Sequence, residues 1–540
     1  MLITTRKTLD KAFTATGWFS TAIIVVTLLV VLGPIVARGM GAVLFEATIE
    51  RRSLFLEHFS RGNPTQIKAE LERAQMARQP LFDAVKSFEA GITVAHLEDA
   101  AKDVYRSYKG ELRLAEGLRS KDAERMLDTA RNLRDEFLEV ITSSNNEEAT
   151  RLAKALLESK YRPGFNDTAM SEIFSMAEAY LETIESVDLS NREIYAADLE
   201  ELKFLLRRLF GPLPDDPEPA LVRDQYGETR WDRAQLVAHQ ILYEETYVDD
   251  DETGMRKVEK VPRVERYRGT AIEPVFGMIE NSLEEMMLPR RVFYWQFITD
   301  ESVDAHFFGG IWPSVLGTIY LTIGALLFAI PFGIAAAVYL SEYAKKTAFI
   351  RIIRSCIDTL AAVPSIVFGL FGLAFFINVV GVSDSKSVLA GALTLALLVL
   401  PTVIRASEEA IKTVPTTYRE ASLGLGASKG RCVLTVVLPA ALPGMLTGIV
   451  ISMGRAAGET APIIFTAAVS VGLPLSAWET LSKPSPALPW TIYNLATEHQ
   501  MVDEIRHVQY GMVLSLMVIV LLLNAFAIFM RAKISKRLRG

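Results

Sequence analysis

An arginine and a glutamate stand four residues apart in a long apolar stretch of the sequence. The segment GRAAGETAP covers residues 454–462, and Arg455 and Glu459 are the only charged residues between about Ala440 and Val471. A charge at the centre of a bilayer costs about 2.5–3.5 kcal/mol on insertion scales, so such residues face a protein interior or an aqueous path. If the segment is one helix, the i,i+4 spacing places both side chains on one face, where they can pair.

Two roles are open for this pair. Arginine has a planar fork that donates two hydrogen bonds to phosphate oxygens. Glu459, with Thr460 beside it, could accept a hydrogen bond from a protonated phosphate oxygen, a donor that sulfate lacks at neutral pH. The pair would then be a weak, transient contact on a translocation path, since a site that binds too tightly stalls transport. The alternative is an ion pair that fixes helix packing and never contacts a substrate.

Small residues accompany the charged pair. Gly454 and Gly458 form a Gly-x-x-x-Gly step, and Gly444 and Gly448 form an earlier one. Such steps let a neighbouring membrane helix approach closely. We therefore expect this face to contact another helix or subunit, or to line the path.

The sequence offers no metal, cofactor or nucleotide chemistry of its own. Its two cysteines and six histidines show no metal-ligand spacing. A phosphate-binding P-loop needs a Gly-Lys dipeptide after a buried strand, and Gly-Lys occurs nowhere in the chain. We expect no metal and no cofactor in this chain, and no hydrolysis of ATP by it.

Six apolar runs are long enough to cross a bilayer. They are about residues 17–37, 314–340, 357–380, 387–404, 443–468 and 509–530. Basic residues gather before the first run, after the second, after the fourth and after the sixth. Because basic loops stay in the cytoplasm, this pattern places both termini inside and residues about 41–305 outside. The first run, including residues 1–40, is expected to be a retained anchor.

The outer segment differs from the rest in charge. Residues 41–304 hold 35 basic and 52 acidic side chains, whereas the whole chain of 540 residues holds 57 and 64. Apolar residues recur every three or four positions over much of 41–305, which predicts a mostly helical domain. An alternating segment around residues 245–267 predicts a small β-hairpin whose turn includes Asp251. The sequence does not indicate what this domain binds.

The inner loop of residues 405–442 contains a candidate docking segment. Tyr418 to Leu425 can form a short helix, with Pro415 before it and glycines after it. A short exposed helix carrying Arg419 and Glu420 suits insertion into a groove of a partner protein, and a loop lying on the membrane surface is the alternative.

This loop resembles the EAA signature of permease subunits of ABC importers. The signature reads Glu-Ala-Ala, three residues, Gly, nine residues and Ile-x-Leu-Pro, with Ser422 and Val436 departing from it here. The residues that match it and would contact the ATPase are Glu420, Ala421, Gly426, Leu438 and Pro439, with Arg419 beside them. Together with GRAAGETAP, the segment of residues 317–344 is similar to the PstA family of phosphate importers. The resemblance covers about residues 307–535 and not the outer domain.

The resemblance implies the following architecture and partners. The fold would be an all-α polytopic membrane protein, with one anchor and a five-span permease core of the type I importer class (residues 306–540), and a mostly helical domain inserted between the first and second spans. The implied partners are a second permease PstC, a dimer of the ATPase PstB that uses ATP and Mg²⁺, and the phosphate-binding protein PstS, in a bacterial inner membrane and without nucleic acid. The chain itself would be non-catalytic.

Two other functions remain open. One is a permease for sulfate, molybdate or phosphonate, which the GRAAGETAP segment disfavours. The other is a membrane sensor with a helical outer domain, although four further apolar runs follow the second one where a signalling module would be expected.

Overall fold

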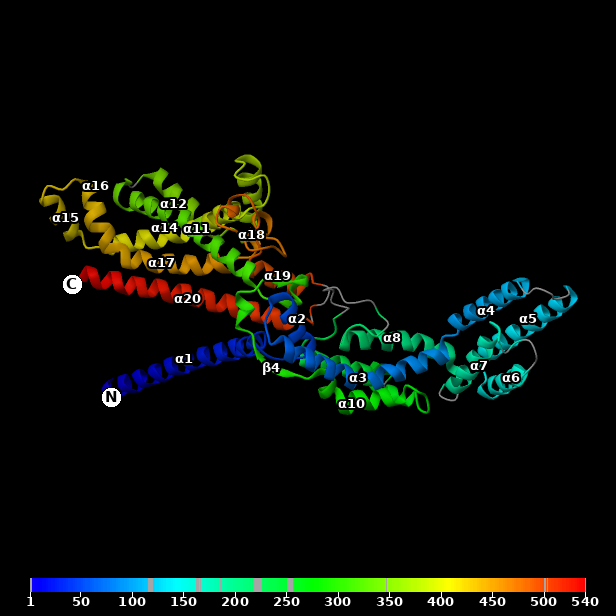
Figure 1. Cartoon of the computed structure of the whole chain (residues 1–540). Coiled ribbons are helices and arrows are strands. Elements are labelled where there is room, and N and C mark those ends of the chain that lie inside the picture. The colour runs from blue at the N-terminus through cyan, green and yellow to red at the C-terminus, as the bar shows by residue number, and fades with distance from the viewer. Residues whose placement is uncertain are drawn as a thin grey trace. The chain divides into compact units, whose positions relative to one another are not determined.

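A computed structural model describes residues 2–114, 120–161, 165, 167–184, 187–214, 216, 226–249, 256–345, 347–499, 502 and 504–539. The chain divides into two compact units (Figure 1). Unit 1 comprises Met1–Phe45 and Val292–Gly540, and unit 2 comprises Glu46–Arg291. Segments 41–45 and 292–305, which we expected in the outer domain, thus cluster with unit 1.

Unit 1 is built from helices. They are α1 (Leu2–Met40), α11 (Trp312–Val338), α12 (Ala348–Ala361), α13 (Ser365–Gly372), α14 (Val388–Lys412), α15 (Thr416–Gly424), α16 (Lys429–Cys432), α17 (Leu438–Gly458), α18 (Ala461–Thr466), α19 (Leu488–Thr497) and α20 (Arg506–Arg539). Three π-helical segments, Tyr339–Tyr343, Leu373–Val379 and Val433–Val437, continue or precede these helices. Two short strands, β5 (Ser302–Val303) and β6 (Phe308–Gly309), pair before α11.

Five helical stretches of the described residues are long and apolar enough to cross a membrane. They are Phe13–Met40, Trp312–Tyr343, Val388–Lys412, Lys429–Gly458 and Arg506–Lys536. A sixth span depends on a helix pair, Ala348–Ala361 and Ser365–Val379, which is bent by 102° at the break between its halves. The chain is therefore an all-α polytopic membrane protein, as the apolar runs predict.

The apolar run of residues 357–380 does not form one straight helix in the structure. The helix ends at Ala361, and Pro364 caps the next helix with an extended backbone, at ψ 137°. Proline lacks an amide hydrogen, and its ring would clash with the carbonyl four residues earlier in a continuing helix. The break therefore falls where the sequence places that proline.

Helix α14 is central to the packing of unit 1. It contacts both α11 and α17, and most of its residues between Val388 and Ile411 are buried. Ser387 begins the helix, since its hydroxyl accepts a hydrogen bond from the amide of Ala390 at 3.1 Å. This helix therefore holds the elements on either side of it in place.

Unit 2 is also mainly helical. Its helices are α2 (Ile49–Phe59), α3 (Pro64–Ile92), α4 (Ala95–Leu114), α5 (Ser120–Thr142), α6 (Asn146–Glu158), α7 (Ser171–Ile184), α8 (Arg192–Phe210), α9 (Trp231–Leu242) and α10 (Glu273–Met287). Strands β2 (Tyr243–Asp249) and β3 (Arg256–Pro262) pair antiparallel, the arrangement that the alternating pattern predicts. The turn between them, with Asp251, lies outside the described residues. A second strand pair joins β1 (Leu44–Ala47) to β4 (Arg290–Phe293).

An extended apolar core supports unit 2. Phe88, Tyr195, Tyr267 and Phe276 form a chain of ring contacts with centroids 5.5–5.8 Å apart, and all four are buried. Helix α3 starts at a defined point because the side chain of Asn63 accepts hydrogen bonds from the two amides after Pro64. Unit 2 thus has the size and core of an independent domain.

Candidate functional site

The first candidate site is the ion pair of Arg455 and Glu459. Nε of Arg455 lies 3.1 Å from Oε1 of Glu459. The two side chains are 36% and 21% exposed, respectively, so the pair lies at a surface of this chain and is not sealed in its core. Both Nη groups of Arg455 are without a partner among the described residues, which leaves donors for a ligand or another subunit.

The pair does not lie within one continuous helix, so our expectation for residues 443–468 was wrong. Helix α17 ends at Gly458, and Glu459 has an extended backbone with φ −77° and ψ 127°. Pro462 stands in the first turn of α18. If α17 continued, that proline would clash with the carbonyl of Gly458, four residues earlier, and leave it without a hydrogen bond. The glutamate is therefore held on a bend beside the end of a helix.

Thr460 lies on the same bend. It is the residue before α18, and its backbone carbonyl accepts from the amide of Ile463 at 3.2 Å. Its side chain makes no capping hydrogen bond. Glu459 and Thr460 thus form the short break between α17 and α18, and Arg455 lies in the last turn of α17.

The four glycines of α17 meet different surroundings. A Cβ at Gly448 would lie 2.1 Å from Cβ of Ala406, and a Cβ at Gly444 would lie 2.8 Å from Cβ of Ala410. These two glycines allow α17 to pack closely on α14. A Cβ at Gly454 would have ordinary contacts with Asn524 of α20, at 3.8 Å, and a Cβ at Gly458 would have no neighbour within 4 Å. The close packing expected at Gly454 and Gly458 is therefore not formed among the described residues of this chain.

The second candidate site is the exposed helix α15. It spans Thr416–Gly424, starts after Pro415 and has no buried residue. Glu420 and Ala421 are exposed, and Leu425, just after the helix, is 90% exposed. Gly426 has φ +85°, a left-handed conformation that glycine adopts without strain. A short exposed helix thus stands where the EAA-like segment predicts one, beginning two residues earlier than expected.

Arg419 is oriented differently from its neighbours in α15. Its guanidinium forms an ion pair with Glu342, Nη2 to Oε1 at 2.7 Å. It also donates to the backbone carbonyls of Ile411 and Val414, at 2.9 and 2.7 Å. The residue therefore fastens α15 to the end of α14 and to the π-helical segment after α11. Leu438 and Pro439 lie at the start of α17, after a second π-helical segment.

The sequence analysis missed the acidic partners at this end of unit 1. Glu342 pairs with Arg419, and Glu408 pairs with Arg354, whose Nη2 lies 3.0 Å from Oε1. Arg405 forms an ion pair with Asp358. These pairs join elements far apart in the sequence. The sequence feature that could have predicted these pairs is the position of each acidic residue near one end of an apolar run, close to a cluster of basic residues.

Among the residues that the structure describes, no group of three or more His, Cys, Asp or Glu side chains could hold a metal ion. Cys356 is exposed, Cys432 is buried, and both are free thiols.

Comparison with known proteins addresses the membrane half of the chain. A family model described as binding-protein-dependent transport system inner membrane component matches residues 329–540. The phosphate transport system permease protein PstA of Yersinia pestis is 38% identical over 226 residues, which is 42% of this chain and 73% of that protein. PstA 1 of Mycobacterium tuberculosis is 34% identical over 246 residues, 46% of this chain and 77% of that protein.

Two further proteins are similar to part of the chain. The probable ABC transporter permease protein YqgI of Bacillus subtilis is 34% identical over 253 residues, covering 45% of this chain and 85% of its own length. A structure of the MetNI methionine ABC transporter covers 42% of this chain and 94% of its own, at 18% identity and a TM-score of 0.32.

Proposed function

The chain belongs to the family of binding-protein-dependent transport system inner membrane components, and from this membership we propose that it is the PstA-type permease subunit of an ATP-driven importer of inorganic phosphate. The observation that carries this proposal is the identity of 34–38% to relatives named phosphate transport permeases. Those matches cover 77% and 73% of the two relatives, and the family model matches residues 329–540 of this chain. A permease subunit is non-catalytic, and a separate subunit hydrolyses ATP.

The proposed assembly contains four kinds of subunit. PstC would be the second permease, a PstB dimer would bind ATP and Mg²⁺, and PstS would deliver phosphate from outside. This chain would hold no cofactor itself. An importer of this class closes and opens its ATPase dimer, and the permeases convert that motion into alternating access.

The protein is an integral membrane protein of the bacterial inner membrane, and we assign its orientation from charge. Figure 1 shows α15, α16 and both chain termini at one end of unit 1. Basic residues lie in α15, in α16 and in the last turns of α20, among them Arg419, Lys429, Arg431, Arg531 and Lys533. Since basic segments stay inside, this end would be cytoplasmic, and the proposed domain of residues 41–305 would be periplasmic.

The proposed substrate contact is the break between α17 and α18. The free Nη groups of Arg455 could donate to two phosphate oxygens, and Glu459 could accept from the protonated oxygen of the monohydrogen or dihydrogen ion. Because Glu459 already pairs with Arg455, the bound anion would have a competitor, which keeps the contact weak enough for release.

The proposed coupling element is α15. Its exposed residues Glu420 and Ala421, together with Leu425 just after it, would enter a groove of PstB, while Arg419 holds the helix to α14 and to the segment after α11. Motion of the ATPase would thereby reach two membrane helices. Gly426, Leu438 and Pro439 would set the path of the chain from this helix back to α17.

The test is uptake of radiolabelled phosphate by cells that lack this chain and every other phosphate importer. We expect uptake to return with the full chain and to resist an excess of sulfate or molybdate. Uptake that stays absent although the protein is inserted and assembled, or that either competitor suppresses, would contradict the phosphate assignment and favour another oxyanion.

A further inference from the structure

Unit 2 contains a cavity of about 450 Å³ beside its buried ion pair. Helices α2 and α3 form two of its sides, and the end of α8 with the residues after it forms another. The residues that line it and enter the argument are Glu50, Glu57, Gln75, Arg78, Phe82 and Phe210. The volume falls in the range of roughly 300–1,000 Å³ that is typical of small-molecule sites.

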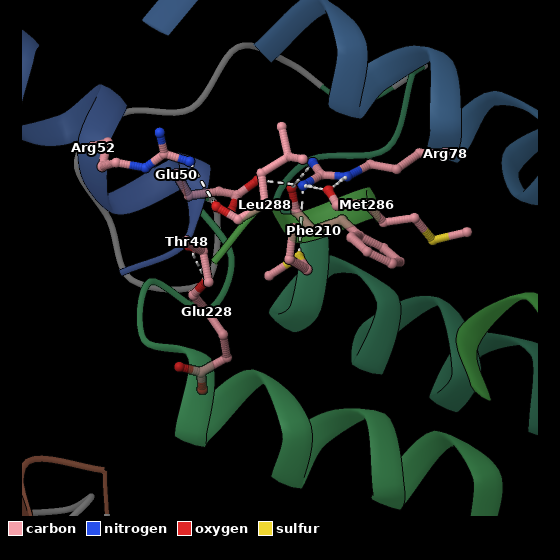
Figure 2. A network of polar contacts seen from close by, with 9 residues as sticks. Thr48, Glu50, Arg52, Arg78, Phe210, Glu228, Met286 and Leu288 are labelled. Atoms are coloured by element: carbon pink, nitrogen blue, oxygen red, sulfur yellow. Dashed lines mark hydrogen bonds and ion pairs between the residues drawn. The ribbon is translucent and has the colours of Figure 1, made fainter. Parts of the chain in front are cut away.

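Arg78 is held at the wall of this cavity by several contacts, which Figure 2 shows. Its Nη2 lies 2.5 Å from Oε1 of Glu50, and its Nε donates to the carbonyl of Met286 at 2.9 Å. Its guanidinium also lies over the ring of Phe210, 4.8 Å from the centroid. The side chain is only 5% exposed. Since these groups engage the guanidinium, an incoming anion finds few free donors.

One carboxylate oxygen of Glu50 lacks a hydrogen-bond donor in the part of the chain that the structure describes. The residue is 8% exposed, and its Oε2 is buried without a hydrogen-bond partner among the described residues. A carboxylate can accept about four hydrogen bonds, and a buried acceptor without a donor is unfavourable. Because Glu50 lines the cavity, a donor bound there would supply the hydrogen bond that Oε2 lacks.

The remaining lining has two chemical characters. Glu57 adds a second carboxylate, so the lining contains two acidic side chains and one basic side chain, Arg78, which is already paired with Glu50. Phe82 and Phe210 supply aromatic surface, with their rings in an edge-to-face arrangement 6.2 Å apart. Carboxylates and aromatic faces both attract organic cations. The same lining disfavours phosphate and other anions.

We propose that this cavity binds a small organic cation that carries an ammonium group on an apolar body. The ammonium donates to Oε2 of Glu50, and the apolar body packs against Phe82 and Phe210. The site lies wholly within unit 2 and does not depend on the proposed transport function.

The test uses 2-phenylethylammonium as the probe and the full chain in lipid nanodiscs, with empty nanodiscs subtracted. We expect saturable binding by calorimetry, and binding of phenylacetate and 2-phenylethanol weaker by about tenfold or more, because each lacks the charged donor. Glu50→Gln keeps the shape of the side chain and should weaken binding of the ammonium by about tenfold.

A second variant tests the cavity without touching the ion pair. Gln75 lines the cavity and is exposed, so Gln75→Trp should fill it and abolish binding. Met76 is the next residue, is 70% exposed and does not line the cavity, so Met76→Trp should bind like the wild type. Absence of saturable binding to the folded wild type, equal binding of the three probes, or unchanged binding by Gln75→Trp would overturn the proposal.

Discussion

At the scale of single residues, the bend after α17 separates two roles that the sequence leaves open. Arg455 is on the helix and Glu459 is on the extended residue after it, so the two positions are not equivalent. A pair that serves only packing should tolerate an exchange of its charges, whereas a phosphate contact needs the guanidinium at its present position.

We predict that the double exchange Arg455→Glu with Glu459→Arg assembles normally but imports phosphate slowly. Arg455→Gln alone should reduce the initial rate of uptake by about tenfold or more, because charge-assisted hydrogen bonds to phosphate are lost. Uptake and co-purification of the other subunits are measured together. Wild-type uptake by the exchanged variant would show that the pair only fixes packing.

His306 is a residue whose protonation opposes folding. It lies before α11, 5% exposed, and its Nδ1 is 2.8 Å from the hydroxyl of Ser302. Burial lowers its pKa to about 4, whereas an unfolded histidine has a pKa of about 6.5. Ala305 and His306 both have positive φ, 48° and 77°, so surrounding contacts must hold this segment in place.

We predict that stability falls as the pH is lowered from about 6.5 to about 4, and that His306 contributes up to about 3 kcal/mol of the loss. In this window the unfolded chain binds a proton and the folded chain does not, so stability increases with pH. Thermal unfolding of wild type and His306→Gln, compared at about pH 7.5 and about pH 5, measures the effect. Equal losses in the two proteins would contradict it.

At the scale of elements, the two glycine steps of α17 differ in their neighbours. We predict that Gly448→Ala destabilises the isolated protein by about 1–3 kcal/mol, the usual cost of overpacking, because its Cβ would meet Ala406 of α14 at 2.1 Å. Gly458→Ala is the matched control and should leave thermal stability in detergent unchanged. Equal effects of the two substitutions would refute the assignment of Gly448 to the α14 contact.

The link between α15 and the membrane helices gives a further prediction. Glu342→Gln removes the ion pair of Arg419, so α15 should be held less firmly. We expect the phosphate transported per ATP hydrolysed, measured with the reconstituted importer, to fall by about fivefold or more while ATP hydrolysis persists. Glu409→Gln, at an exposed carboxylate of α14, is the control. An unchanged ratio in an intact Glu342→Gln complex would exclude a coupling role for the pair.

At the scale of the whole molecule, the chain leaves unit 1 after Phe45 and returns to it at Val292, and the residues of unit 1 beside these two points are close together. The amide of Tyr294 donates to the carbonyl of Val43 at 2.7 Å, and both residues belong to unit 1. We predict that a short flexible linker can replace residues 46–291, and that the shortened chain assembles and imports phosphate at a rate comparable to the full chain. Loss of uptake by an assembled shortened chain would instead give unit 2 a part in phosphate delivery or gating.

The sequence predicted the elements better than their breaks and contacts. Apolar runs locate the membrane helices, because length and hydropathy are local properties. The presence of a proline does not by itself predict whether a helix ends there. Helix α11 continues through Pro331, whereas α17 ends before Pro462 and the third apolar run bends at Pro364. The outcome depends on neighbouring helices and on the residues before each proline.

Contacts between distant segments could not be predicted from local sequence patterns. The inward orientation of the Arg419 side chain depends on Glu342, 77 residues away, and the cavity of unit 2 is formed by residues of three helices.

The contact between the first and last helices also has a consequence for biosynthesis. Arg38 near the end of α1 donates to the hydroxyl of Tyr510 in α20 at 2.7 Å, across 472 residues of chain, and a Cβ at Gly39 would lie 2.7 Å from Cβ of Leu514. At roughly 5–20 residues per second, translation of the intervening chain takes on the order of 25–95 s. During that time α1 is already in the bilayer and its partner helix does not yet exist. The contacts between the first and last helices can therefore form only after nearly the whole chain has been synthesised.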